Sequence, residues 1–386
     1  MKLSRLFSEF FKSERTGGFI LILMTIISLV IANSPAGTGY AGIWNSKLGG
    51  HELVYWINDG LMTVFFLLIG LELEREIYTG ELSDFRNAVL PVLAAIGGML
   101  IPAGIYFLIN LGSYTISGAG IPMATDIAFA IGILSLLGKR VPSSLKIFLT
   151  ALAVIDDLGA IVVIAVFYSS SIVVMNLFIA LLIFLFLILL NRLKVHNLIP
   201  YLAGGAAMWY FMLNSGIHPT ITGVLLAFAI PFGDGGKTSP SFILQHQIHK
   251  PVAYMVLPLF ALANTCIPVA GNLSSSLVNA SSLGIISGLV IGKPAGIILF
   301  SILAVTTGIA SLPGDLNWKM IAGAGLLGGI GFTMSIFITL LGFKDTDLIN
   351  NSKIAILIAS CIAGISGYIW LRINLKSTSV DSLSDE

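Results

Sequence analysis

The stretch FLTALAVIDDLGAIVVIAVF, from Phe148 to Phe167, decides the fold. It is an apolar run about as long as the ~20 helical residues that cross the hydrocarbon core of a bilayer. Its only charged residues, Asp156 and Asp157, fall near its centre. An ionised side chain at the centre of a membrane helix costs roughly 2.5–3.5 kcal/mol on insertion scales, so such residues usually line a pathway. The stretch therefore predicts a transmembrane helix that carries a functional site.

The composition of the chain places most of it in a membrane. Of its 386 residues, 56% are hydrophobic and only 10% are charged, too few charges to cover a soluble protein of this length. The hydrophobic residues come in long runs, unlike the short alternating segments of a membrane barrel. The net charge of +1 indicates no nucleic-acid partner, and Cys266 and Cys361 have no metal-binding spacing. We predict an all-α polytopic membrane protein surrounded by membrane lipid.

Apolar runs separated by polar, Gly or Pro residues predict about twelve transmembrane helices. The first run, 15–32, follows several basic residues and could be a secretory signal. It is long for a signal and no small-residue cleavage site follows it, so we interpret it as a span. The other predicted spans are 57–78, 88–109, 119–138, 144–167, 172–191, 198–213, 217–232, 243–266, 282–306, 318–342 and 351–373.

Lysine and arginine are distributed unequally between the two ends of these spans. Of the 20 Lys and Arg residues, Lys293 lies within a span, and Lys47, Lys344 and Lys353 lie on one side. All the others lie on the opposite side, which the positive-inside rule makes the cytoplasm. We expect a bacterial inner-membrane protein with both termini cytoplasmic, which requires an even number of spans.

The predicted domain organisation is simple. We expect one transmembrane domain over 1–376, with a short external hairpin at about 36–56. The polar segment 377–386 is predicted to be a disordered cytoplasmic tail.

Two predicted spans are interrupted in the same way, near 118–130 and 323–335. One contains GAGIPMATD from Gly118 to Asp126, and the other contains GAGLLGGIGFTMS from Gly323 to Ser335. Unwound backbone in a membrane is tolerated only where protein or water surrounds it, and paired interrupted helices are the best sequence pointer to a transporter's ion site. The alternative is that these glycines only permit close helix packing. Close packing is the better interpretation of the glycines that recur every four residues at 284, 288, 292 and 296.

Ionisable residues inside the spans form the candidate ion pathway. Asp156 and Asp157 point about 100° apart on a helix, so they need not share one set of ligands. A buried carboxylate can bind either a proton or a hard cation, which is the competition that an exchanger of the two requires. Lys293 needs a carboxylate partner, for which Asp156 is the first candidate and Asp126 the second. Asp126 and Lys293 could offset the charged ends of half-helices, and Thr125 could lend an oxygen to an alkali cation.

A second group of titratable residues lies at the predicted ends of spans. Its histidines titrate near neutral pH and could bias a conformational equilibrium. The alternative is an ordinary solvated helix end with pairs four residues apart. The members are Glu72, Glu74, Arg75, Glu76, His246 and His249 on the cytoplasmic side and His218 on the other.

Two classes of intramembrane protease do not fit the sequence, and we expect no enzyme. GISG at Gly364–Gly367 matches a serine protease motif, but that mechanism needs a later histidine and none follows His249. Intramembrane aspartyl proteases use aspartates on separate helices, one of them in a GxGD motif that this chain lacks. No cofactor is expected beyond transported Na⁺, Li⁺ and H⁺.

From about Glu14 to Leu371 the chain resembles the bacterial NhaA-type sodium/proton antiporters. Many motifs occur in the right order along nearly the whole chain. They are FFLLIGLELERE from Phe65, IPMATDIAFAIG from Ile121, LTALAVIDDLGAI from Leu149, IHPTITGVLLAF from Ile217, PLFALAN from Pro258, GKPAGI from Gly292 and GIGFTMSIFI from Gly329.

The resemblance implies twelve helices in an inverted repeat, with two interrupted helices crossing near the membrane centre. It implies that Asp157 is the principal sodium ligand, that Asp156 beside it pairs with Lys293, that Asp126 and Lys293 offset the half-helix ends, and that Thr125 lies at the crossing. It implies electrogenic exchange of cytoplasmic Na⁺ or Li⁺ for more than one external proton, and a homodimer formed through the first external hairpin.

The resemblance also implies a pH sensor at the cytoplasmic end, formed by Glu72, Arg75 and Glu76, with His218 at a position tied to the pH response. One residue departs from the pattern, because Gln245 stands where an acidic sensor residue is expected. Two rival functions stay open: a sodium-coupled importer of an organic anion, and a cation channel. The importer needs a larger polar cavity, and the buried Asp–Lys pair argues against an open pore.

Overall fold

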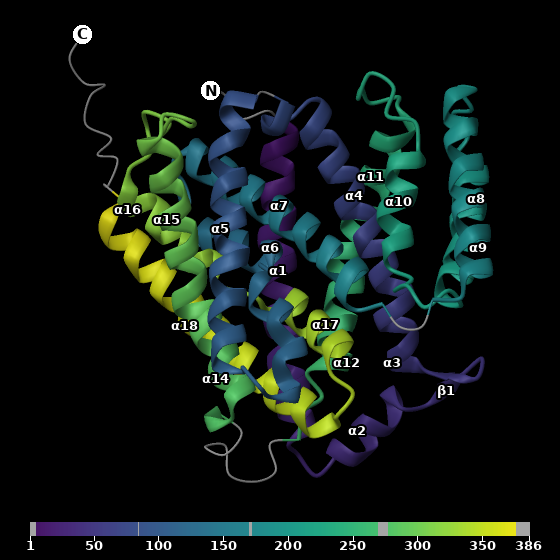
Figure 1. The fold of residues 1–386 in the computed structure, drawn as a ribbon, viewed down its shortest axis with the longest axis horizontal. Coiled ribbons are helices and arrows are strands. Elements are labelled where there is room, and N and C mark those ends of the chain that lie inside the picture. The colour runs from purple at the N-terminus through teal and green to yellow at the C-terminus, as the bar shows by residue number, and fades with distance from the viewer. Residues whose placement is uncertain (1–4, 84, 170–171, 269–276, 376–386) are drawn as a thin grey trace.

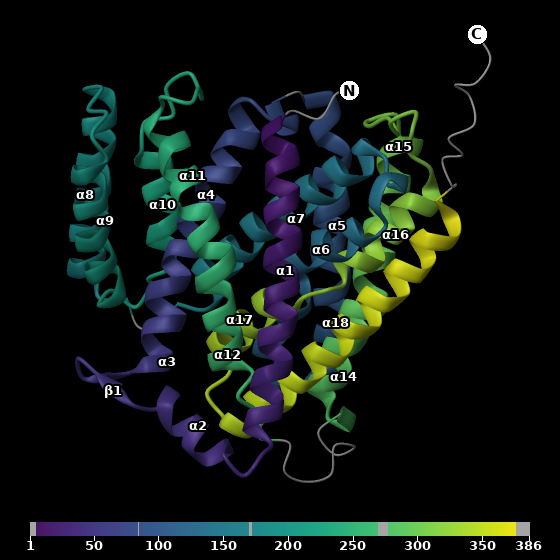
Figure 2. The ribbon, with the colours of Figure 1, turned by 180° about the vertical axis from the view of Figure 1, so that it is seen from behind.

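The computed structural model describes residues 5–83, 85–169, 172–268 and 277–375, so the predicted tail at 377–386 lies outside the described residues. Long helices lie side by side and run between two ends of the molecule (Figures 1 and 2). α1 (Arg5–Ala32) begins at the end that we call the inner end, and α18 (Thr346–Asn374) runs towards it. The opposite, outer end carries α2 (Gly37–Trp44) and a small hairpin.

The described elements are almost entirely helical. The remaining α-helices are α3 Leu53–Tyr55, α4 Met62–Tyr78, α5 Phe85–Ile109, α6 Ile127–Leu136, α7 Ser143–Phe167, α8 Val174–Arg192, α9 Leu198–Leu213, α10 Ile221–Ala229, α11 Pro240–Pro251, α12 Leu257–Asn264, α14 Ala280–Ser287, α15 Lys293–Thr306, α16 Trp318–Gly328 and α17 Phe332–Gly342. The 3-10 helices are η2 Glu81–Ser83, η3 Tyr114–Met123 and η4 Gly138–Arg140, and the π-helical segments are η1 Trp56–Leu61, η5 Val252–Val256 and η6 Gly288–Gly292. Strands β1 Lys47–Leu48 and β2 His51–Glu52 pair antiparallel, Lys47 with Glu52.

Seven helices among the described residues are long and apolar enough to cross a membrane, and two further helix pairs could each form one bent span. The protein is therefore a mostly helical, multi-pass membrane protein, as predicted. The predicted spans at 198–213, 217–232 and 243–266 correspond to α9, α10 and the series α11–η5–α12. These three segments are too short or too polar to be identified as membrane spans by length and hydropathy alone. The total of twelve spans therefore stays a prediction.

Two bends mark the predicted interruptions. η3 meets α6 at 42°, and α16 meets α17 at 46°. The intervening residues 124–126 and 329–331 are all buried, which protects their unwound backbone from lipid. The two breaks also contact each other directly, because the Asp126 N–H donates to the Ile330 carbonyl at 2.7 Å.

Glycines allow the central helices to cross closely. A Cβ on Gly296 of α15 would collide with the backbone carbonyl of Gly97 in α5, and one on Gly288 would lie 2.7 Å from the Pro122 side chain. A Cβ on Gly292 would lie 2.9 Å from the Pro102 Cα. The stripe therefore serves packing, and it holds the helix that carries Lys293 against α5 and η3.

One sequence interpretation is corrected by the start of the last helix. The last span was predicted to begin at 351, with Lys353 counted on the outer side, but α18 already begins at Thr346. Asp345 caps this helix by accepting from the N–H groups of Asp347 and Leu348 at 2.8 and 3.2 Å. The cap extends the helix outward, and Lys353 is a helical residue that is only 8% exposed.

Candidate functional site

The two helix breaks bring four helix ends together in the interior. α6 and α17 begin there, whereas η3 and α16 end there. Helix N-terminal ends carry about half a positive charge and C-terminal ends about half a negative charge. Each end also has backbone groups without a partner inside its own helix. The side chains at the crossing must satisfy both requirements.

Asp126 caps both N-terminal ends. One carboxylate oxygen accepts from the Phe129 N–H of α6 at 3.0 Å. The other accepts from the Thr333 N–H of α17 at 3.1 Å and from the Thr333 hydroxyl at 2.6 Å. The side chain is 2% exposed and bonds to groups of both helix ends. A single carboxyl group thus faces two positive helix ends.

Lys293 and Thr125 face the two C-terminal ends. The Lys293 ammonium donates to the Met123 carbonyl, the last residue of η3. The Thr125 hydroxyl lies 2.9 Å from the Gly328 carbonyl, the last of α16, and 2.6 Å from an oxygen of Asp156. Its single proton can go to only one of the two, so Thr125 couples a helix end to the charge state of Asp156.

Asp156 is the ion-pair partner of Lys293. Their charged atoms lie 2.8 Å apart, and both side chains are fully buried. The sequence left Asp126 open as a second candidate, but the three bonds of Asp126 are all to the N-terminal ends. Removing one member of a buried pair leaves an uncompensated charge, so this contact constrains both α7 and α15.

Asp157 points away from this pair into a cavity. It is 2% exposed, and its Oδ1 has no hydrogen-bond partner among the residues that the structure describes. The cavity measures about 30 Å³, and Glu72 is the other acidic residue in its lining. That volume holds one or two waters or a small cation. The rest of the lining is apolar and includes Phe65, Leu68 and Val154.

The cavity reaches a polar cluster at the inner end, formed by α4 and α11. The Arg75 guanidinium donates to the Gln245 side-chain oxygen at 3.2 Å and lies over the Phe242 ring, 4.9 Å from its centre. An oxygen of Glu72 lies 3.5 Å from Nδ1 of His249. A neutral amide thus meets Arg75 where an acidic residue was expected, and Glu72 connects this cluster to the cavity of Asp157.

The remaining predicted residues of the inner end lie around the same helices. Glu74 is 4% exposed and accepts from the Ser241 hydroxyl at 3.1 Å. His246 stacks on Phe242, with ring centres 6.0 Å apart. Glu76 packs against Gly80 at the end of α4.

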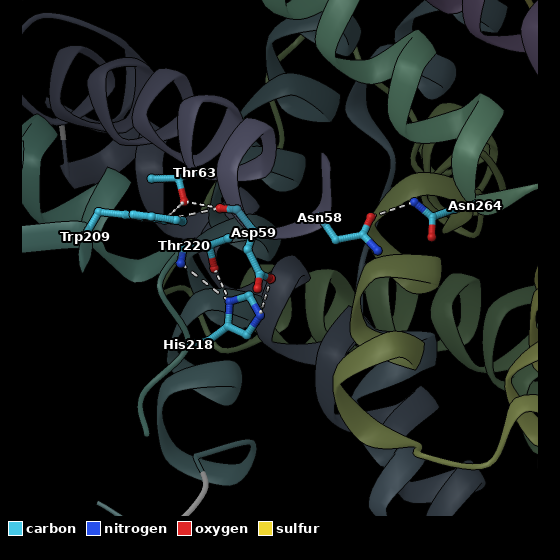
Figure 3. Close-up of polar contacts among 7 residues, drawn as sticks. All are labelled: Asn58, Asp59, Thr63, Trp209, His218, Thr220 and Asn264. Carbon is cyan, nitrogen blue, oxygen red and sulfur yellow. Dashed lines mark hydrogen bonds and ion pairs between the residues drawn. The ribbon is translucent and has the colours of Figure 1, made fainter. Parts of the chain in front are cut away.

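His218 belongs to a separate polar cluster near the outer end, drawn in Figure 3. Its Nε2 lies 3.4 Å from Oδ1 of Asp59, and its Nδ1 lies 2.8 Å from the Thr220 hydroxyl. Asp59 belongs to the π-helical segment η1, and its backbone carbonyl accepts from Thr63 at 2.5 Å and from Trp209 at 3.3 Å. The cluster therefore ties η1 to α9 and to the loop before α10.

Sequence reasoning missed Asp59 as a member of this cluster. The signal was present, because Asp59 is a carboxylate inside the predicted span 57–78. It also missed Thr333, whose two bonds to Asp126 connect the crossing helices.

Aromatic rings separate the crossing from the outer cluster. The Phe337 ring of α17 lies 5.5 Å from that of Phe66, 6.4 Å from that of Phe260 and 5.4 Å from the ring of His218. Phe66, Phe260 and Phe337 are all buried. The described cavity of Asp157 leads towards the inner end, and this aromatic contact lies on its outer side.

Comparison with known proteins places these features in a family. The family model described as Na⁺/H⁺ antiporter 1 matches residues 8–371. The Na(+)/H(+) antiporter NhaA of Flavobacterium psychrophilum is 63% identical over 382 residues, covering 99% of this chain and 100% of that protein. NhaA 1 of Flavobacterium johnsoniae is 64% identical over 372 residues (96% and 98%), and NhaA of Cytophaga hutchinsonii is 57% identical over 386 residues (100% of both). Because the family model and these relatives match nearly the whole chain, this protein belongs to the Na⁺/H⁺ antiporter 1 family.

Proposed function

We propose that the protein is an electrogenic antiporter that exports cytoplasmic Na⁺ or Li⁺ in exchange for external H⁺. The observation that carries the proposal is the position of Asp157, a carboxylate that faces a small cavity beside the buried Asp156–Lys293 pair. Family membership supports exchange of sodium for protons, and the site supplies one group that both ions can occupy in turn.

The exchange would run by alternating access to Asp157. With the inner end open to the cytoplasm, Asp157 loses its proton and binds a cation that enters past Glu72. A negative charge on Asp157 interacts electrostatically with the neighbouring Asp156–Lys293 pair. Thr125 links Asp156 to the helix end at Gly328. After the inner end closes and the aromatic contact at Phe337 opens, external protons displace the cation. If more than one proton enters per cation, the membrane potential adds about 2.3 kcal/mol per charge per 100 mV to sodium export.

The cavity favours this function over the rivals. An organic anion needs a pocket of several hundred Å³, whereas the cavity at Asp157 measures about 30 Å³. A channel needs a continuous pore, whereas buried Phe66, Phe260 and Phe337 lie on the outer side of the site.

We further propose that the inner cluster regulates transport by pH, through Glu72, Arg75, Glu76, His246 and His249. His218 would respond on the outer side through its contact with Asp59. Because Gln245 does not titrate, the contact between Arg75 and Gln245 would not respond to acid, and acid would shut transport down less steeply than an acidic residue at 245 would allow.

The setting of the protein follows from the same proposal. It would lie in the bacterial inner membrane with both termini in the cytoplasm, and it would serve sodium and pH homeostasis without a cofactor. Residues 36–56, with the β1–β2 hairpin, would join two copies into a homodimer. Cross-linking of single-cysteine variants at Leu48, which is 61% exposed, tests that contact, and a protein that stays monomeric in the membrane contradicts it.

The deciding experiment is a pH-gradient assay in everted membrane vesicles. Na⁺ and Li⁺, but not K⁺, should collapse the gradient in vesicles that contain the wild-type protein. Asp157→Asn should abolish the effect, because the amide takes up no proton at neutral pH and lacks the negative charge that a proton and a cation would compete for. The matched control, Asp345→Asn, changes the same group at an exposed helix cap and should retain activity. An undisturbed gradient in the wild type at every pH would contradict the antiporter function.

A further inference from the structure

Two asparagines near the outer end form a polar contact that the transport scheme does not use. Asn264, the last residue of α12, is 1% exposed. Its amide nitrogen donates to the Phe260 carbonyl at 3.0 Å and to the side-chain oxygen of Asn58 at 2.7 Å. Both amide protons are therefore used. The side-chain oxygen of Asn264 has no hydrogen-bond partner among the residues that the structure describes.

A buried acceptor of this kind requires a partner. The large majority of buried side-chain polar atoms in proteins are hydrogen-bonded, since an unpaired acceptor loses its bond to water without replacement. The two bonds of the nitrogen set the orientation of the amide, so rotating it would only leave a donor unpaired instead. The oxygen can be satisfied from outside the chain by a water or by a cation.

The surroundings favour a cation over water alone. Asn58 supplies a second amide oxygen, which among the described residues accepts the bond from Asn264 alone and keeps a free lone pair. The next residue, Asp59, turns towards His218 (Figure 3), so it supplies negative charge near the pair rather than a ligand. The C-terminal end of α12, with its partial negative charge, ends at Asn264 itself.

The pair also lies where a transported cation would leave. Asn58 and Asp59 are partly exposed, whereas Asn264 is buried. Phe260, one helical turn before Asn264, packs against Phe337 of α17, the helix that begins at the crossing. A displacement of α17 would therefore open the aromatic contact next to the two amides.

We propose that the side-chain oxygens of Asn58 and Asn264 form an outer subsite for a partly dehydrated monovalent cation, Na⁺ or Li⁺, on its way between Asp157 and the outer solution. This inference rests on the proposed antiporter function. Two neutral oxygens, with water as the other ligands, bind a cation only weakly. Weak binding suits a site on the exit path, because the ion must be able to leave it.

The first test measures binding without transport. Purified full-length Asp157→Asn protein, which lacks the central ligand, is titrated with radioactive Na⁺ in a scintillation proximity assay. We expect weak binding that disappears in Asp157→Asn/Asn264→Leu and in Asp157→Asn/Asn58→Leu. Asn58 is partly exposed, so its variant keeps the test valid if the buried Asn264 variant fails to fold. Equal residual binding in all three proteins means that the amides hold water only, and it overturns the proposal.

The second test compares the two faces of the membrane. In proteoliposomes of known orientation, Asn264→Leu should raise the KM for Na⁺ presented at the outer face by about three- to tenfold, the factor for one lost neutral contact. The KM at the inner face should stay unchanged. The control is Thr265→Val, because Thr265 is equally buried but its hydroxyl is bonded within the helix to Ala261 at 2.7 Å. It should leave both KM values unchanged.

The outcomes separate the two proposals. An equal rise of KM at both faces, or the same rise in Thr265→Val, overturns the outer subsite but leaves the antiporter function standing. A wild-type protein that moves no protons with Na⁺ overturns the antiporter function, while the binding test still decides whether the amides hold a cation.

Discussion

Asp126 is the residue whose replacement tests the crossing most directly. The change is Asp126→Asn, which keeps the shape of the side chain but removes its charge and one of its two acceptor oxygens. The amide oxygen can still accept from one helix end. The amide nitrogen must then face the N–H groups of the other end, Phe129 or Thr333, where donor meets donor.

The size of the effect follows from the bonds at stake. Hydrogen bonds to a charged group contribute about 1.5–3 kcal/mol each, and a negative charge at a helix N-terminus about 0.3–2 kcal/mol. At least one charge-assisted bond and the interaction with two helix ends are lost, so we expect a loss of roughly 3–4 kcal/mol in the stability of the native state. Thr333→Val removes only the hydroxyl bond to the carboxylate and should cost about 1.5–3 kcal/mol.

The assay is thermal unfolding of the detergent-purified protein at one scan rate, since membrane proteins often unfold irreversibly. The matched control is Asp345→Asn, because Asp345 caps the single helix α18 and is exposed. Because asparagine caps a helix about as well as aspartate, it should cost only about 0.3–1 kcal/mol, for the negative charge lost at one helix N-terminus. If Asp126→Asn lowers the unfolding temperature no more than Asp345→Asn does, Asp126 does not serve two helix ends and the account of the crossing is wrong.

Three further predictions follow from packing and charge. Lys293→Met should destabilise the protein by about 3–5 kcal/mol, because it leaves Asp156 buried without its partner. Adding Asp156→Asn should restore part of the lost stability. A double variant that is less stable than the single variant contradicts the pairing. Gly296→Ala should lower the unfolding temperature, because its Cβ would collide with the Gly97 carbonyl. The control Gly314→Ala has open space around it and should leave the unfolding temperature unchanged. An equal fall in unfolding temperature in both variants would refute the close crossing. Val154→Ile adds one methylene at the cavity of Asp157 and should slow Na⁺-dependent proton movement about tenfold or more. The control Val162→Ile, at an exposed position of the same helix, should not slow it. Unchanged transport in both variants would show that this cavity is not the route of the ion.

The predictable part of this protein is the part that a single helix reveals. Hydropathy over about 20 residues identifies a span, and a charge inside it is conspicuous, so Asp126, Asp156, Asp157 and Lys293 could be selected without a structure. The same reasoning located both broken segments, because glycine, proline and threonine in the middle of an apolar run are visible in one dimension. The short, polar or bent segments at 198–266 were less certain, because length and hydropathy fail where helices are short and carry polar residues such as Gln245 and His249.

Contacts between helices were beyond the sequence. Two aspartates in consecutive positions look equivalent in one dimension, yet a rotation of about 100° along α7 turns Asp156 to Lys293 and Asp157 to the cavity of Glu72. Three contacts join residues that lie far apart in the chain. They are the ion pair of Lys293 with Asp156 rather than Asp126, the bond of Thr333 to Asp126, and the pairing of His218 with Asp59. The sequence by itself determined that this is a helical membrane protein with charged groups in its spans, because burying such groups in lipid is costly wherever they lie. Only the tertiary structure decided which charge faces which, since that depends on the rotation and crossing of packed helices.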